Sequence, residues 1–319
     1  MKYLVTGGAG FIGSHLVEGL LARGETVRVV DSFLTGKIEN LEPFLERIEL
    51  VRGDVADPAV AACAVGGMDF VLHQAALPSV PRSVADPLAC HHNCVTATVS
   101  VLEASRKAGV RRVVLASSSS VYGDQPELPK RETQAPAPLS PYAAAKLSCE
   151  IYARTFSRLH GLSTACLRYF NVFGPRQDPK SQYAAVIPAF VTTVLADGRP
   201  VVYGDGGQGR DFTFVGNVVE ANILAATAAR KLSGEAMNVA CGQKFSLLDL
   251  LAEISRLAGR EAEPRFEPAR AGDVRDSLAD VALARELIGY RPGTSFAEGL
   301  RITVASYGAG GPSAGAGKG

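Results

Sequence analysis

The chain predicts a doubly wound α/β fold (Rossmann type), in which a parallel sheet is joined to a smaller mixed α/β lobe. Three observations lead to this prediction: short apolar runs recur along the first half, helix-like segments separate most of them, and the pattern loosens into Gly- and Pro-rich connections after Tyr169. Strands buried on both faces of a parallel sheet read as continuous apolar runs. With 319 residues the chain can bury a large core.

Six runs are expected to be strands because they are short, apolar and partly β-branched. They are Lys2 to Thr6, Thr26 to Asp31, Glu49 to Gly53, Phe70 to His73, Val113 to Ala116 and Ala165 to Leu167. A helix is expected to open near Phe11. Another should begin just before Tyr142, because Ser140 followed by Pro141 supplies a cap and a first helical position.

The second half is expected to form a cap on the sheet, with loops between its elements that build the site. Helices are expected near Ala184 to Ala196, Val218 to Ala229, Leu247 to Leu257 and Val281 to Ile288. We assign residues 1–170 to the sheet domain, with a returning segment near 211–239, and residues 171–210 and 240–307 to the second lobe. Residues 308–319, mostly Gly, Ala and Ser, are expected to form a flexible tail.

Composition argues against several functions. The formal net charge is +1 and the arginines are scattered, so neither nucleic acid nor an acidic membrane surface is an expected partner. No apolar stretch has the length of a bilayer span and no signal-like segment opens the chain, so we expect a soluble cytoplasmic protein. The six cysteines include no Cys-x-x-Cys pair. The run from Cys90 to Cys94 is better explained by buried thiols than by metal ligands, and no metal is expected.

Three glycines mark a candidate dinucleotide site. Gly7, Gly10 and Gly13 follow the first strand and open the first helix, where glycines permit a tight turn and let backbone N–H groups approach a pyrophosphate. Asp31 closes the second strand, where a carboxylate can accept hydrogen bonds from ribose hydroxyls and would repel a 2′-phosphate. No arginine follows it, so the predicted cofactor is NAD rather than NADP.

Tyr142 and Lys146 outline a hydride-transfer site. Side chains at i and i+4 share one helix face, so the ammonium should favour the phenolate, lower the pKa of the phenol and make Tyr142 a usable base near neutral pH. Tyr-x-x-x-Lys also occurs by chance in many helices. The serine run from Ser117 to Ser120, at an upstream strand end, strengthens the functional interpretation.

These motifs together resemble the extended short-chain dehydrogenase/reductase superfamily, and its nucleotide-sugar branch in particular. The resemblance spans Met1 to about Tyr307 and is carried further by Asp54, His73-Gln74-Ala75-Ala76, Arg168-Tyr169-Phe170-Asn171-Val172-Phe173-Gly174-Pro175, Gly204-Asp205-Gly206 with Arg210-Asp211-Phe212, and Arg270-Ala271-Gly272-Asp273-Val274-Arg275. One departure is Cys94, which stands where the family usually has asparagine, with Asn93 one position away. A polar contact near the cofactor is thereby left open.

The resemblance implies residue roles. Tyr142 would be the acid/base, Ser118 would hydrogen-bond the reacting sugar hydroxyl, and Lys146 would also hold the nicotinamide ribose. The implied NAD contacts are Gly7, Gly10, Phe11, Ile12, Gly13, Asp31, Asp54, Val55, Gln74, Ala75, Ala76, Tyr142 and Lys146. The implied substrate contacts are Ser79, Ser118, Ser119, Ser120, Tyr142, Asn171, Gln177, Ala185, Val186, Arg210, Arg270, Asp273 and Ser277, of which Asn171, Arg210 and Arg270 would bind the nucleotide diphosphate.

The residues beside Ser118 indicate the reaction. Sugar 4,6-dehydratases resemble one another in carrying an Asp-Glu pair where this chain has Ser119 and Ser120, and UDP-glucuronate decarboxylases usually place glutamate at the position of Ser120. Hydroxyls alone suit a simpler cycle, C4 epimerisation of a UDP-sugar through a 4-keto intermediate. The alternatives are a UDP-glucuronate 4-epimerase or decarboxylase and, in another class, a non-catalytic NAD sensor, which would commonly have lost Tyr142 or Lys146.

Ser277 bears on the sugar, because UDP-galactose epimerases restricted to unsubstituted hexoses resemble one another in carrying tyrosine there. A small residue leaves room for an N-acetyl group. The chain also resembles UDP-N-acetylglucosamine 4-epimerases in three places: the run from His73 to Ser83, Gln177, and the pair Ala185-Val186. The predicted substrates are UDP-GlcNAc and UDP-GalNAc, with UDP-Glc and UDP-Gal as further candidates. Alternatively, Ser277 only hydrogen-bonds a loop. The resemblance also implies a homodimer through helices around residues 90–107 and 142–158.

Overall fold

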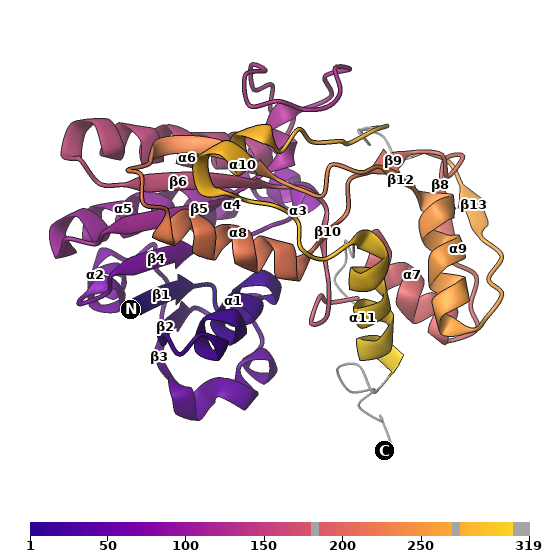
Figure 1. The fold of residues 1–319 in the computed structure, drawn as a ribbon, viewed down its shortest axis with the longest axis horizontal. Helices are drawn as coiled ribbons and strands as arrows, with labels where there is room; N and C mark the ends of the chain where they lie inside the picture. The colour runs from indigo at the N-terminus through magenta and orange to yellow at the C-terminus, as the bar shows by residue number, and fades with distance from the viewer. Residues whose placement is uncertain (180–184, 270–274, 309–319) are drawn as a thin grey trace.

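A seven-stranded parallel sheet forms the centre of the computed structural model, which describes residues 1–179, 185–269 and 275–308 (Figure 1). The strands lie in the order β11-β6-β5-β4-β1-β2-β3, and the doubly wound α/β prediction is confirmed. Their bounds are β1 Lys2–Thr6, β2 Thr26–Asp31, β3 Ile48–Arg52, β4 Phe70–His73, β5 Arg112–Ser118, β6 Thr164–Tyr169 and β11 Ser233–Val239.

The strand predictions are correct in number and place for the first half of the chain. β1, β2 and β4 have the expected bounds, β3 lies one residue earlier than expected, and β5 and β6 are longer than the apolar runs that predicted them. The extra residues of β5 and β6 are polar, including Ser117 and Arg168, so apolar content alone did not include them. β11 was not among the predicted strands; it comes from the second half and pairs with β6.

Helices cover both faces of the sheet. On one face α1 (Phe11–Ala22), α8 (Val215–Thr227) and α10 (Ala282–Ile288) contribute to one apolar core. On the other, α2 (Pro58–Val65), α5 (Ala97–Ala108) and α6 (Pro141–His160) contribute to a second core. Short helices α3 (Val80–Ala85) and α4 (Pro87–His91) and a π-helical turn (His92–Thr96) lead into α5. Within the described ranges, no helix is both long and apolar enough to cross a membrane.

A smaller lobe lies beside the sheet, at the right of Figure 1. Its helices α7 (Val186–Leu195), α9 (Leu247–Ala258) and α11 (Phe296–Gly308) share a third apolar core with an aromatic cluster around Phe173 and Phe296. Two-stranded pairings complete it: β7 (Val172–Phe173) with β10 (Thr213–Phe214), β9 (Gly209–Arg210) with β12 (Phe245–Ser246), and β8 (Val201–Tyr203) with β13 (Arg265–Glu267).

The end of the chain differs from the sequence prediction. Residues from Phe296 to Gly308 form α11, which was not predicted, and Gly308 belongs to this helix rather than to the expected tail. Buried Phe296, Leu300 and Val304 recur at helical spacing and pack on α7 and α9, which stabilises the helix. Residues 309–319 lie outside the described residues.

Candidate active site

The end of β5 and the first turns of α6 bring Ser118, Tyr142 and Lys146 together. The predicted cap is confirmed, because the Ser140 side chain accepts a hydrogen bond from the backbone N–H of Ala143, with Pro141 as the first helical residue. The Lys146 ammonium donates to the carbonyl oxygen of Ala116 at 2.8 Å, and its Nζ lies 5.8 Å from the centroid of the Tyr142 ring. Ser118 lies on the same cavity wall as Tyr142, and its side chain lowers the pKa of the phenol.

The expected effect of Lys146 on the pKa of Tyr142 is only partly right. Burial raises the pKa of Tyr142 above its ordinary value, and the nearby Lys146 charge and Ser118 side chain offset that increase without reversing it. The expectation that the protein's own lysine would give a lowered pKa is therefore wrong. The physical reason is desolvation, which penalises the phenolate and which a helix spacing does not reveal.

The serine run divides between different partners. Ser117, Ser118 and Ser119 line a large cavity, whereas Ser120 is not among the described residues that line it. Instead, both the backbone N–H and the hydroxyl of Ser120 donate to Ser118 Oγ, at 3.1 and 2.8 Å. Ser120, predicted to contact substrate, thus orients the hydroxyl that lies beside Tyr142.

The cavity has a volume of about 770 Å³, within the range of ligand pockets. Every residue that the resemblance assigned to NAD lines it, as do Ser79, Gln177 and Ala185. Further lining residues were not predicted, among them Ser32, Leu34, Thr35, Gly36, Lys37, Asn40 and Asn93. The segment from Ser32 to Gly36 follows Asp31 directly, so the position of that carboxylate was the signal that could have identified it.

The glycine turn fits a pyrophosphate group. Gly7 has a φ of +66°, and a Cβ on Gly13 would lie 2.1 Å from the Gly7 carbonyl oxygen, so a side chain cannot stand there. The N-terminus of α1 has no side-chain cap. Its backbone N–H groups are thus available to an anion, as the helix dipole favours.

Asp31 fits the ribose end of a dinucleotide. Its carboxylate lines the cavity and accepts hydrogen bonds from the backbone N–H groups of Ala9 and Phe33, at 2.9 and 2.8 Å. Burial raises the pKa of Asp31, and these two hydrogen bonds oppose the increase. A Cβ on Gly36 would lie 2.8 Å from the same carboxylate, so the loop approaches it as closely as glycine allows.

The question that Cys94 left open has a structural answer. Cys94 is 1% exposed and packs with Cys90 and Cys149 against Tyr142, whereas Asn93 lines the cavity. Both residues lie in the π-helical turn between α4 and α5, where the wider turn changes the direction of successive side chains. The amide at the cavity wall is therefore that of Asn93.

A second cavity of about 300 Å³ continues the first, because Asn171, Val172 and Ala185 line both. Its wall includes the predicted Val186 and Arg210, together with unpredicted Tyr203, Gln208 and Phe190. Aromatic and apolar side chains with a few polar groups suit a planar heterocyclic base. These residues come from β8, α7 and the loop before β9, whose proximity no local sequence pattern indicates.

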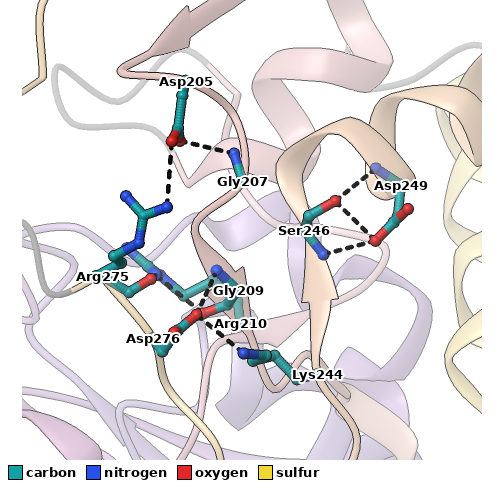
Figure 2. Close-up of polar contacts among 9 residues, drawn as sticks. All are labelled: Asp205, Gly207, Gly209, Arg210, Lys244, Ser246, Asp249, Arg275 and Asp276. Atoms are coloured by element: carbon teal, nitrogen blue, oxygen red, sulfur yellow. Dashed lines mark hydrogen bonds and ion pairs between the residues drawn. The ribbon is translucent and has the colours of Figure 1, made fainter. Parts of the chain in front are cut away.

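Figure 2 shows how Arg210 is held beside the segment of Arg275 and Asp276. The Arg210 guanidinium donates to the carbonyl oxygens of Gly209 and Arg275, at 3.0 and 2.9 Å. The Asp276 carboxylate accepts from the Gly209 N–H at 3.0 Å and lies 3.3 Å from the Lys244 ammonium. These contacts anchor the segment along β9.

Ser277 contacts Asn171 in the described structure. The Asn171 side-chain amide donates to Ser277 Oγ at 3.4 Å, and Ser277 is not among the described residues that line either cavity. The predicted contacts Arg270 and Asp273 lie outside the described residues. Among the described residues, no group of three or more His, Cys, Asp or Glu side chains is arranged to hold a metal.

His73 makes the stability of the fold sensitive to acid. It is 3% exposed, and burial, followed by the charge of Lys146, lowers its pKa to about 3. Between pH 6.5 and about 3, His73 is protonated in the unfolded chain and neutral in the folded protein. The free energy of unfolding should therefore fall as pH drops toward 3, by on the order of 1.4 kcal/mol per pH unit from this residue.

Denaturation at pH 7, 6 and 5 tests this prediction with His73→Gln, which removes the titrating ring. The variant should lose less stability between pH 7 and pH 5 than the unmodified protein does. His160→Gln, at an exposed position, is the matched control and should keep the full pH dependence. Equal pH dependence in the His73→Gln variant and the unmodified protein would contradict the assignment.

Comparisons with known proteins agree with this geometry. The sequence model described as "NAD dependent epimerase/dehydratase family" matches residues 3–240. The UDP-glucose 4-epimerase of Mycolicibacterium smegmatis is 40% identical over 308 residues, covering 95% of this chain and 97% of the relative. Among solved structures, the UDP-N-acetylglucosamine 4-epimerase of Methanobrevibacter ruminantium in complex with UDP-N-acetylmuramic acid has a TM-score of 0.91 at 40% identity, covering 96% and 97% of the two chains.

The UDP-glucose 4-epimerase of Thermus thermophilus, solved in complex with NAD, has a TM-score of 0.87 at 38% identity, covering 96% of this chain and 99% of that one. The glycine turn, the Asp31 carboxylate and the cavity volume all fit NAD, and NAD is the cofactor of this chain.

Proposed function

This chain belongs to the NAD-dependent epimerase/dehydratase family, and from that premise we propose that it inverts C4 of a UDP-hexose. The proposed substrates are UDP-GlcNAc and UDP-GalNAc, together with UDP-Glc and UDP-Gal. The observation that carries the proposal is the set of groups around Tyr142: hydroxyls of Ser118 and Ser119 at the cavity wall, with Ser120 hydrogen-bonded to Ser118. No carboxylate follows Ser118 to add an elimination or decarboxylation step.

Each residue at this end of the cavity has a proposed task. Bound NAD supplies reversible hydride transfer at C4. Tyr142 accepts the proton of the C4 hydroxyl and returns it after the 4-keto sugar has turned its other face. Ser118 holds that oxygen next to the phenol, and Lys146 stabilises the phenolate by its charge. Proton and hydride both return to the sugar, so the cofactor ends the cycle as it began.

The second cavity supports recognition of the uridine diphosphate. Its apolar and aromatic wall suits the base. Asn171 lines both cavities, and Arg210 lines the second. A guanidinium fork is suited to phosphate oxygens. We assign Asn171 and Arg210 to the diphosphate, with Arg270 as a further contact.

A UDP-glucuronate 4-epimerase is the second candidate, and one observation favours it. The exposed Arg82 side chain lines the first cavity near Ser79, where a guanidinium could receive a C6 carboxylate. The serine run does not separate the two candidates. A UDP-glucuronate decarboxylase is less well supported, because Ser120 replaces its usual glutamate.

A panel of substrates tests the proposal. Purified protein is incubated separately with UDP-Glc, UDP-GlcNAc and UDP-GlcA, without added NAD, and the products are separated and identified. We expect UDP-GalNAc from UDP-GlcNAc and UDP-Gal from UDP-Glc. UDP-galacturonate as the sole product would favour the second candidate. No product from any of the three would contradict the proposal and favour the non-catalytic NAD sensor.

Ser277 offers a sharper test of the sugar. Ser277→Tyr should reduce turnover of UDP-GlcNAc by about tenfold or more while leaving UDP-Glc turnover within about twofold. Ser277 itself lines neither cavity, but a tyrosine side chain is long enough to reach past Asn171 into the first cavity and take the room of an N-acetyl group. Ser277→Ala is the matched control and should keep both activities. Equal losses on the two sugars in the tyrosine variant would instead indicate a loop-bonding role.

We also propose that the protein is a homodimer that pairs through α5 and α6. Ile151, Tyr152 and Leu159 of α6 are 59%, 41% and 72% exposed. Tyr152 and Leu159 are seven residues apart and share one face of the helix, and Ile151 borders that face. Sizing chromatography should give the mass of two chains, and a monomer would contradict the proposal.

The division into a sheet domain (1–170 and near 211–239) and a substrate lobe (171–210 and 240–307) is likewise proposed, and limited proteolysis between the two would test it.

A further inference from the structure

Three consecutive residues of β5 are tied to three residues on one face of α6. The carbonyl oxygen of Ala116 accepts from the Lys146 ammonium at 2.8 Å. The Ser117 hydroxyl donates to Glu150 Oε1 at 2.5 Å. The Ser118 side chain lines the same cavity as Tyr142 and lowers the pKa of its phenol. Tyr142, Lys146 and Glu150 are spaced four residues apart, so the helix presents them in one row. Two of these three contacts involve Lys146 or Tyr142, which belong to the proposed chemistry. The third contact is the one that Glu150 makes with Ser117.

Arg168 completes the tie at Glu150. It stands on β6 directly opposite Ser117 in the β5–β6 register, and its Nε and Nη2 donate to the two oxygens of Glu150 at 2.9 and 2.7 Å. Both side chains are only 4% exposed. The guanidinium also lies 4.7 Å from the centroid of the Tyr122 ring. One carboxylate thus joins α6 to both β5 and β6.

A buried ion pair of this kind is a poor source of stability. Removing two charges from water carries a large desolvation cost, so replacing such a pair by apolar side chains of similar volume is often neutral or stabilising. What apolar side chains cannot reproduce is a bidentate geometry that accepts from Ser117 at the same time. The pair therefore specifies where α6 lies along β5.

We propose that Glu150 and Arg168 are positioning residues for the proton transfer, a proposal that rests on the proposed function. They act through Ser117 and set the position of the Tyr142 and Lys146 turns of α6 against Ser118. Loss of the tie lets α6 move relative to the strand end, and a displacement of the order of 1 Å between reacting groups can cost about a hundredfold in rate.

The decisive variant replaces both charges, Glu150→Leu with Arg168→Met. We expect its melting temperature to stay within about 3 °C of the unmodified protein and NAD to co-purify. We expect kcat to fall by about tenfold to a hundredfold, with KM for the UDP-sugar within about threefold. The matched control, Glu298→Leu with Arg301→Met, removes an exposed pair on α11 and should leave all four quantities unchanged.

The pH at which Tyr142 ionises distinguishes a positioning role of Glu150 and Arg168 from a packing role. The ionisation of Tyr142 is followed as the tyrosinate absorbance that is missing in Tyr142→Phe, which requires no turnover. Tyr142 and Lys146 move together with α6, whereas Ser118 stays on β5. A displaced helix therefore weakens the Ser118 contribution that lowers the pKa of Tyr142, and the ionisation should move to higher pH by about half to one unit. A role limited to packing would leave it in place.

Ser117→Ala keeps the Glu150–Arg168 ion pair and removes the hydrogen bond that links Glu150 to β5. It therefore tests the positioning role even if the double variant does not fold. It should lower kcat and raise the pH of the ionisation in the same direction, by smaller amounts. Unchanged kcat and an unchanged ionisation in Ser117→Ala, or full activity in a folded double variant, would overturn the proposal. An unmodified protein without activity on any UDP-sugar would refute the proposed function instead, and the absorbance measurement would then decide the positioning role.

Discussion

Tyr142→Phe should lower turnover of the UDP-sugar by about 10²- to 10⁴-fold, the range that a positioned acid/base supplies. The change removes the phenolic oxygen and leaves the ring, which packs against Cys90 and Cys94. Volume is preserved, so the fold and the NAD cavity should be unaffected. We expect NAD to co-purify in the same amount as with the unmodified protein, measured after denaturation by its absorbance.

A second tyrosine on the same helix supplies the control. Tyr152 of α6 is 41% exposed, and Tyr152→Phe should keep full turnover. Substantial activity in the Tyr142→Phe variant would refute the proposed acid/base role. Loss of NAD from that variant would show that the change had damaged the cofactor site, so the two readouts separate chemistry from binding.

Gly13→Ala should abolish retention of NAD and destabilise the protein. An added Cβ would lie 2.1 Å from the carbonyl oxygen of Gly7 and 2.8 Å from the Cα of Gly8. Gly7 cannot move away easily, because its own turn lies against the backbone of Ala75. The helix must therefore shift out of the glycine turn. We expect a cost on the order of 1–3 kcal/mol in the free energy of unfolding, and no co-purifying NAD.

Gly293→Ala is the matched control, since a Cβ there would meet nothing within 4 Å. It should bind NAD and unfold as the unmodified protein does. Stability is measured by denaturant titration and NAD by absorbance of the released cofactor. Full NAD occupancy in the Gly13→Ala variant would show that the first turn of α1 does not contact the pyrophosphate.

Much of the fold was predictable because its signals are local. The apolar runs of β1, β2 and β4 end at polar or turn residues, and the Ser140-Pro141 cap begins α6 where expected. A strand buried on both faces must be apolar along its whole length, whatever it packs against. The same locality explains the misses: β11 and α11 acquire their stability from partners far away in the chain.

The candidate site was predictable to the extent that its residues share short motifs. The glycine turn, Asp31 and the Tyr142–Lys146 pair each lie within a few residues of a strand end or a helix start, and all line one cavity. Asn93 was identified only as a neighbour of Cys94, because a π-helical turn decides which side chain reaches the cavity wall. Ser120 was assigned to substrate although it contacts Ser118, since a serine run does not reveal which hydroxyl points where.

Local signals were therefore enough to predict six of the seven sheet strands, the cofactor and the family resemblance, because backbone periodicity and glycine geometry depend on neighbouring residues alone. The electrostatics of the site and the exact neighbours of its reactive groups became known from the folded structure. The pKa of Tyr142 depends on how much protein excludes water from its ring, and Glu150 of α6 meets Ser117 on β5 and Arg168 on β6 only in the folded chain. Burial and long-range partners exist only once the chain has folded.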